Sequence, residues 1–155
     1  MKVRTITLAL AMLTLSVGLR AQQDPLIGTW KLNLSKSKFS PGPPLRSNTL
    51  QYEAQGDALK VIADFVTGDG VSHHEEDTPI PDGKDYPIAG GVDRDSVTMK
   101  RIDAYTAEFV GKKAGKTTLT MLRVVSKDGK TLTITGTGTN AKGQKVNNVA
   151  VFDKQ

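Results

Sequence analysis

The 155-residue chain contains no cysteine. This absence excludes a disulfide framework, a metal site with cysteine ligands, a cysteine nucleophile and a lipid anchor attached through a lipobox cysteine. Aromatic residues make up only 5% of the chain, so a hydrophobic core must be built mainly from Val, Leu, Ile and Met. The sequence also lacks a G-x-S-x-G elbow, a P-loop and an H-E-x-x-H motif. We therefore expect a protein without enzymatic activity and without a cofactor.

Long apolar runs are also missing beyond the N-terminus. Residues 1–21 combine Lys2 and Arg4 with an uncharged, largely apolar stretch from Thr5 to Leu19, and Ala21 supplies a small residue before a cleavage site. This is the pattern of a secretory signal peptide. The apolar run is shorter than the roughly 20 residues that a transmembrane helix needs. We expect export across a bacterial inner membrane, to the periplasm or as a secreted protein, with no stable membrane insertion after the signal is removed.

The excess of positive charge belongs largely to this segment. The full chain has 21 Lys and Arg against 16 Asp and Glu, a formal net charge of +5. Removing Lys2, Arg4 and Arg20 leaves 18 against 16, a net charge of +2 over residues 22–155. A nearly balanced surface argues against nucleic acid and against a polybasic membrane contact as partners. Residues 22–155 have the size of a single domain, and we expect a monomer.

Alternating patterns indicate strands throughout this domain. Trp30, Leu32 and Leu34 alternate with polar residues, which is the period-two pattern of a strand with one buried face. About ten such segments are joined by turns rich in Gly, Asp and Asn, and Asp-Gly pairs favour hairpins. Consecutive hairpins either close into a barrel or split into a sandwich. Only residues 35–46 are long enough for the crossover of a sandwich, so the sequence predicts an all-β, antiparallel up-and-down barrel of eight to ten strands.

Several segments resemble a known group of barrels. Residues 28–32 (Gly-Thr-Trp-Lys-Leu) resemble the first strand of lipocalins and fatty-acid-binding proteins, and residues 148–154 resemble their final strand. Residues 82–87 and 124–133 resemble segments of exported bacterial lipocalin-like (calycin) proteins. The resemblance covers most of the domain and agrees with a lipocalin-like barrel over residues 22–155.

The resemblance also implies roles for particular residues. It assigns Gly28 and Trp30 to the closed floor of the barrel, with the tryptophan beneath a basic side chain from a late strand. Fatty-acid-binding proteins carry an Arg-x-Tyr pair in their last strand, and residues 149–152 contain neither residue. Their mechanism of carboxylate binding is therefore not carried over to this chain.

The leading hypothesis is binding of a small hydrophobic or amphipathic molecule inside the barrel, since barrels of this size can hold one such ligand. Arg123 shares the parity of Met121 and Val125, and a guanidinium on an interior face would suit a ligand carboxylate or phosphate. Alternatively, Arg123 stacks on Trp30 or faces solvent. Arg101 has the same ambiguity. The residues expected to line the ligand site are Tyr52, Val61, Ala63, Phe65, Met99, Arg101, Met121 and Arg123.

Two other segments allow more than one interpretation. His73, Glu75 and Asp77 share one face of a strand, where ligands two residues apart can chelate a metal. Because this run is uniformly polar, a solvated edge strand is the favoured interpretation, and we expect no metal. Residues 35–46, which include Phe39, form either a lid over one end of the barrel or a surface crossover.

Two further functions remain as alternatives. If side chains fill the interior, the protein is a structural or protein-interaction module of the cell envelope, using its outer face or the loop at residues 41–44. An enzyme of the calycin type is the third option, with Tyr52, Glu108 and Arg123 as its site.

Overall fold

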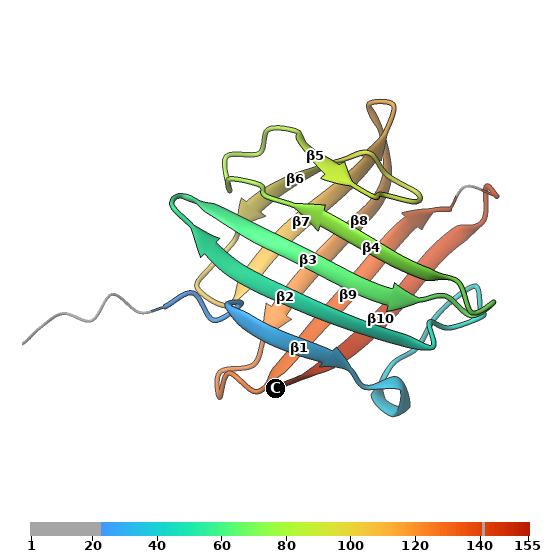
Figure 1. The fold of residues 1–155 in the computed structure, drawn as a ribbon, viewed down its shortest axis with the longest axis horizontal. Coiled ribbons are helices and arrows are strands. Elements are labelled where there is room, and N and C mark those ends of the chain that lie inside the picture. Colours follow the sequence, from blue (N-terminus) through green and yellow to red (C-terminus); the bar gives the residue numbers. More distant parts are fainter. Residues whose placement is uncertain (1–22, 141) are drawn as a thin grey trace, which may run out of the picture.

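A computed structural model describes residues 23–140 and 142–155; the expected signal peptide lies outside the described residues. Ten antiparallel strands form one closed barrel, in which each strand pairs with its neighbours in sequence and β1 pairs with β10 (Figure 1). The prediction of an antiparallel up-and-down barrel of eight to ten strands is confirmed, with ten. The strands are β1 (Gly28–Leu32), β2 (Ser47–Gln55), β3 (Ala58–Val66), β4 (Ser72–Asp77), β5 (Tyr86–Ala89), β6 (Ser96–Arg101), β7 (Thr106–Lys113), β8 (Lys116–Val125), β9 (Thr131–Thr139) and β10 (Lys145–Lys154).

Helical structure in the described part of the chain is limited to one 3₁₀ turn, η1 (Leu34–Lys36). No helix within that part has the length and the apolar character needed to cross a membrane. In Figure 1, β2, β3 and β4 form the nearer wall of the barrel, and β7, β8 and β9 form the farther wall.

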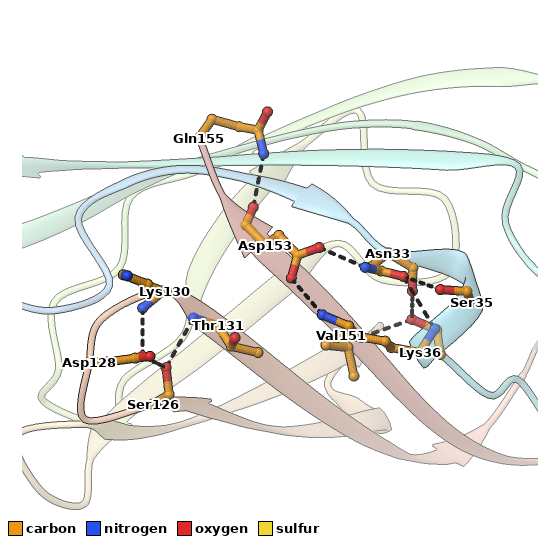
Figure 2. Close-up of polar contacts among 11 residues, drawn as sticks. Asn33, Ser35, Lys36, Ser126, Asp128, Lys130, Thr131, Val151, Asp153 and Gln155 are labelled. Atoms are coloured by element: carbon orange, nitrogen blue, oxygen red, sulfur yellow. Dashed lines mark hydrogen bonds and ion pairs between the residues drawn. The ribbon is translucent and has the colours of Figure 1, made fainter.

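Local side-chain hydrogen bonds fix the hairpin between β8 and β9. The Ser126 hydroxyl donates to Asp128 at 2.6 Å, and the carboxylate of Asp128 accepts from the backbone N–H of Lys130 at 3.0 Å (Figure 2). The Thr131 N–H donates to Ser126 Oγ at 3.0 Å. Gly129 supplies the positive φ of 70° that this turn requires. The Asp-Gly signal in the sequence thus corresponds to a hydrogen-bonded turn.

The strand pair that closes the barrel is also held by side chains. Asn33 donates to Asp153 at 2.6 Å and accepts from the backbone N–H of Lys36, so it caps η1 and links it to β10 (Figure 2). The ammonium of Lys36 lies 3.3 Å from the second carboxylate oxygen of Asp153. Ser37 Oγ accepts from the N–H of Val151 at 2.9 Å. These contacts fasten the chain leaving β1 to the last strand.

One end of the barrel is closed around Trp30. The Trp30 side chain is fully buried and its indole N–H donates to the carbonyl of Leu26 at 2.8 Å. The ammonium of Lys154, on β10, lies 4.9 Å from the centre of the indole ring. Gly28 has a φ of 129°, and a Cβ at this position would lie 2.9 Å from Lys154 Cε. Glycine therefore permits both the backbone conformation and the approach of the lysine.

Large buried side chains fill the interior toward this end. The bulkiest members of the core are Trp30, Tyr52, Met99, Phe109, Leu132 and Phe152, and of these Phe152 also borders the cavity. The opposite end carries the loops that follow β1, β3 and β5, and it is there that the interior is hollow.

Candidate functional site: the barrel cavity

A cavity of about 310 Å³ occupies the hollow end of the barrel. Its apolar lining comes from both walls, and its mouth is formed by the loop after β1 and the loop between β5 and β6. The apolar lining residues from the strands are Leu50, Val61, Ala63, Phe65, Leu119, Met121, Ile134, Ala150 and Phe152. The polar lining includes Asn48, Glu75, Asp77, Arg94, Arg123 and Asn148.

Strand register explains why two carboxylates of β4 face the cavity. Asp77 pairs with Val61 on β3, and Glu75 pairs with Ala63. Both partners are buried, and directly opposed residues point to the same side of a sheet. The interpretation of this run as a solvated edge strand is therefore wrong, because β4 pairs on both sides and presents Glu75, only 4% exposed, to the interior.

Arg123 is the buried cation of the site. Its side chain is 6% exposed, and its guanidinium carbon lies 3.6 Å from the ring centre of Phe109 and 5.4 Å from that of Tyr52. The expected alternatives, stacking on Trp30 or exposure to solvent, are both wrong, since Lys154 covers Trp30. Among the described residues, Nε and Nη1 of Arg123 are buried without a hydrogen-bond partner.

A second arginine lies at the mouth and is already paired. The guanidinium of Arg94 forms an ion pair with Glu75, whose other carboxylate oxygen accepts from the backbone N–H of Val92 at 3.2 Å. Glu75 therefore holds the loop between β5 and β6 against β4. This contact is not predictable from the sequence pattern, because Arg94 lies in an irregular segment whose direction no periodic pattern indicates.

Burial shifts the pKa values of Asp77 and Tyr52. Burial raises the pKa of Asp77 from 3.8 to about 6, although the charges of Arg123 and Arg94 oppose the change. Burial also raises the pKa of the Tyr52 hydroxyl. The positive charge of Arg123 opposes this rise in pKa, and the negative charge of Asp77 adds to it. Within the part of the chain that the structure describes, Asp77 Oδ1, Tyr52 Oη and Asn48 Oδ1 are buried and accept or donate no hydrogen bond. Unsatisfied buried polar atoms of this kind are uncommon and mark a site that needs an explanation.

The residues expected to line the ligand site divide into two groups. Val61, Ala63, Phe65, Met121 and Arg123 line the cavity. Tyr52 and Met99 are almost fully buried in the core toward the closed end. The expectation that they line the cavity is corrected, because residues of one inward face lie at different depths along a barrel with tilted strands.

Arg101 has a different position from the one expected. It lies at the end of β6 toward the closed end of the barrel, where its guanidinium forms an ion pair with Asp24. It is absent from the lining of the cavity. The expectation of a second polar anchor at Arg101 is corrected accordingly: this side chain ties the segment before β1 to the barrel.

The loop after η1 borders the cavity mouth. Phe39, Pro41, Pro43 and Leu45 contribute to the lining, which replaces the expectation of a surface crossover. Backbone hydrogen bonds join Lys38 and Val149 at 2.7 and 2.8 Å, so the loop continues the edge of β10. The Ser40 N–H also donates to the Asn148 side chain at 2.9 Å. The loop is a fixed rim, with its apolar side chains turned toward the opening.

The histidines lie apart from the polar lining. The ring of His73 stacks on Phe65 with centres 5.0 Å apart, and His74 Nδ1 lies 2.7 Å from Asp64 on an exposed surface. Across residues 23–140 and 142–155, no group of three His, Asp or Glu residues is arranged to hold a metal ion.

Comparisons with known proteins identify the fold. No family model matches the chain, and no curated protein matches it significantly. Among solved structures, it is similar to the zebrafish ileal bile acid-binding protein in complex with cholic acid, with a TM-score of 0.55 and 13% sequence identity. The alignment covers 84% of this chain and 99% of the zebrafish chain. At this identity the similarity establishes a shared barrel fold and nothing finer.

Proposed function

We propose that this protein binds a small amphipathic molecule reversibly in the barrel cavity, without enzymatic activity. The observation that carries the proposal is the cavity of about 310 Å³, with apolar walls and a few buried polar atoms that lack partners. Ligand sites are typically concave, mostly apolar and roughly 300–1,000 Å³ in volume, with a small number of polar groups that orient the ligand.

Small residues in the walls of the barrel leave room for the cavity. Ala63 lines the nearer wall and Gly136 the farther one. A Cβ at Gly136 would lie 3.6 Å from Leu119 Cδ1 and 3.9 Å from Met121 Cγ, which are ordinary contact distances. The glycine therefore adds volume to the cavity, whereas a larger side chain there would fill it.

The similarity in fold supports the class of ligand and no particular compound. The zebrafish structure contains cholic acid, which is a small amphipathic molecule. The present chain shares 13% identity with that protein, so the proposal extends only to an amphipathic ligand that the cavity can enclose.

The first test uses protein purified from its own host. Native mass spectrometry should show a non-covalent adduct of lipid-like mass, which gentle denaturation releases. The second test is fluorescence titration with N-phenyl-1-naphthylamine, an uncharged apolar probe. Binding should raise the emission of the probe, and a bound amphipathic molecule should displace it.

A matched pair of variants locates the binding. Ala63→Trp places a large ring in the cavity and should abolish the fluorescence increase, whereas Ala54→Trp adds the same ring on an exposed part of β2 and should leave it unchanged. Thermal unfolding of both variants checks that each one folds. Equal probe binding by both variants, or no binding by the unmodified protein, would instead favour an envelope interaction module.

We further propose that the protein acts outside the cytoplasm after residues 1–21 are removed. The charged start and the apolar stretch of this segment support the proposal. N-terminal sequencing of the protein from the periplasmic and culture-medium fractions tests it. Full-length protein confined to the cytoplasm would contradict it.

A further inference from the structure

Hydrogen-bond donors and acceptors line the same cavity without partners. Within the described residues these atoms are Nε and Nη1 of Arg123, Oδ1 of Asp77 and Oδ1 of Asn48. A guanidinium can only donate, whereas a carboxylate and an amide oxygen accept. Arg123 is more than nine-tenths buried, so its N–H groups face the cavity and the core instead of bulk solvent.

Only some ligand head groups can form hydrogen bonds both with the donors of Arg123 and with the acceptors of Asp77 and Asn48. A ligand carboxylate would accept from Arg123 but has no hydrogen to give to Asp77 or Asn48. An alkylammonium would donate to Asp77 but offers no acceptor to Arg123. A head group that both accepts and donates, such as a primary amide or an alcohol, can bond to each of them. Leaving a buried polar atom unpaired costs free energy, so these alternatives differ in affinity.

The charges around the cavity argue against an anionic head group. The charged lining residues of the described chain are three carboxylates, Glu75, Asp77 and Asp93, and two guanidiniums, Arg94 and Arg123. Arg94 is engaged by Glu75. The remaining cation therefore shares the cavity with at least one carboxylate, and no excess of positive charge is left to neutralise a bound anion. A buried charge without compensation is strongly unfavourable.

On the basis of the function proposed above, we infer that the cavity selects an uncharged amphipathic molecule whose head group both accepts and donates a hydrogen bond. Arg123 donates to the acceptor of this group, and Asp77 accepts from its donor. Asp77 is then the residue that discriminates against fatty-acid carboxylates. The apolar chain of the ligand lies along Leu119, Met121 and Ile134.

Three probes with the same chain length and different head groups test the inference. Decanamide, decanoate and decylammonium are titrated against bound N-phenyl-1-naphthylamine at about pH 8, where Asp77 is ionised. Decanamide should displace the probe at a concentration at least about tenfold lower than decanoate or decylammonium.

The variant Asp77→Asn removes the charge and keeps the shape of the side chain. It should strengthen decanoate binding by about tenfold and change decanamide binding by less than about threefold. Asp57→Asn, in the exposed turn between β2 and β3, removes one carboxylate away from the cavity and serves as the control. It should leave the order of the three probes unchanged.

The outcomes separate this inference from the proposed function. Decanoate binding as tightly as decanamide to the unmodified protein would overturn the inference, as would an Asp77→Asn protein with unaltered decanoate affinity. If the naphthylamine binds but none of the three chains displaces it, the inference fails and the proposed function stands. If the naphthylamine does not bind and no co-purified adduct is found, the proposed function fails as well. Should Asp77→Asn not fold, the three-probe comparison on the unmodified protein decides.

Discussion

The guanidinium carbon of Arg123 lies 3.6 Å from the ring centre of Phe109, so a cation is stacked on an aromatic face inside the barrel. Stacking of this kind is attractive, but two nitrogen atoms of the Arg123 guanidinium have no hydrogen-bond partner among the described residues. The proposed ligand would supply partners for these nitrogen atoms, whereas the stability of the fold does not require an arginine here, because buried charges are often replaced by apolar residues without loss of stability.

Replacing Arg123 by methionine tests this directly. At about pH 5, where Asp77 is largely protonated, Arg123→Met should raise the free energy of unfolding by about 1 kcal/mol, since the cost of burying the cation is removed. At about pH 8 the gain should shrink, because ionised Asp77 loses a neighbouring positive charge. Urea unfolding at the two pH values measures both effects. A loss of several kcal/mol at the lower pH would show that Arg123 is a structural requirement.

Asp77 should make the stability of the protein fall as the pH rises. Its pKa is about 6 in the folded protein and 3.8 when unperturbed, so the folded state holds the proton more tightly between these values. This difference in pKa contributes up to about 3 kcal/mol to the free energy of unfolding. The contribution is fully present below about pH 4 and is lost as the pH rises through 6. Asp77→Asn should remove this loss and stabilise the protein at about pH 8. Denaturant unfolding from pH 4 to 8 checks it, and an identical pH profile for both proteins would contradict it.

Two glycines of β9 should respond in opposite ways to the same substitution. A Cβ at Gly136 meets only ordinary contacts, so Gly136→Ala should stabilise the strand by about 0.5–1 kcal/mol. A Cβ at Gly138 would collide with the backbone oxygen of Thr118, so Gly138→Ala should cost about 1–3 kcal/mol. The two glycines lie two residues apart on β9, so their positions in the sequence do not distinguish them. Thermal unfolding compares the two variants, and changes of the same sign would contradict the geometry.

Gly28 should be required for two separable reasons. Its φ of 129° is unfavourable for other residues, and a Cβ would press on Lys154 Cε at 2.9 Å. Gly28→Ala should therefore cost about 1–3 kcal/mol. Adding Lys154→Ala should recover only the part that comes from the collision, and the backbone strain should remain. A double-mutant cycle in urea measures the two parts; complete recovery would show that the backbone conformation costs nothing.

Alternation, together with the turn signals between the segments, was enough to predict a closed antiparallel barrel of eight to ten strands, and the structure has ten. Val61, Ala63 and Phe65 were also correctly expected to face inward together. Parity alone does not show how deep along the barrel axis a residue lies, since depth depends on strand tilt and stagger. Met99 and Met121 share the interior, but only Met121 lines the cavity.

The inward orientation of the carboxylates of β4 was the main feature of the site that the sequence pattern did not predict. A run of His, Glu and Asp resembles a solvated strand because burial of charge is normally unfavourable. Here Glu75 is compensated by Arg94, which comes from a loop nineteen residues further on. Pairings between an irregular loop and a strand leave no periodic trace in the sequence. The contact between Arg101 and Asp24, across 77 positions, is of the same kind.

The shortest strand, β5, has a consequence for where the barrel can open locally. β5 pairs with β4 through Ala89 and Ile88, and with β6 through Tyr86 and Pro87, of which proline has no N–H to donate. One further backbone hydrogen bond runs from the N–H of Ile88 to the carbonyl of Asp95 at 2.9 Å. The ring of inter-strand hydrogen bonds is thinnest here, and β5 is the segment with the lowest expected cost of local opening. The ion pair between Arg94 and Glu75 spans the same seam at the cavity mouth. Local opening of the barrel is therefore expected to begin with the separation of this one short strand from its neighbours, while the other strands stay paired.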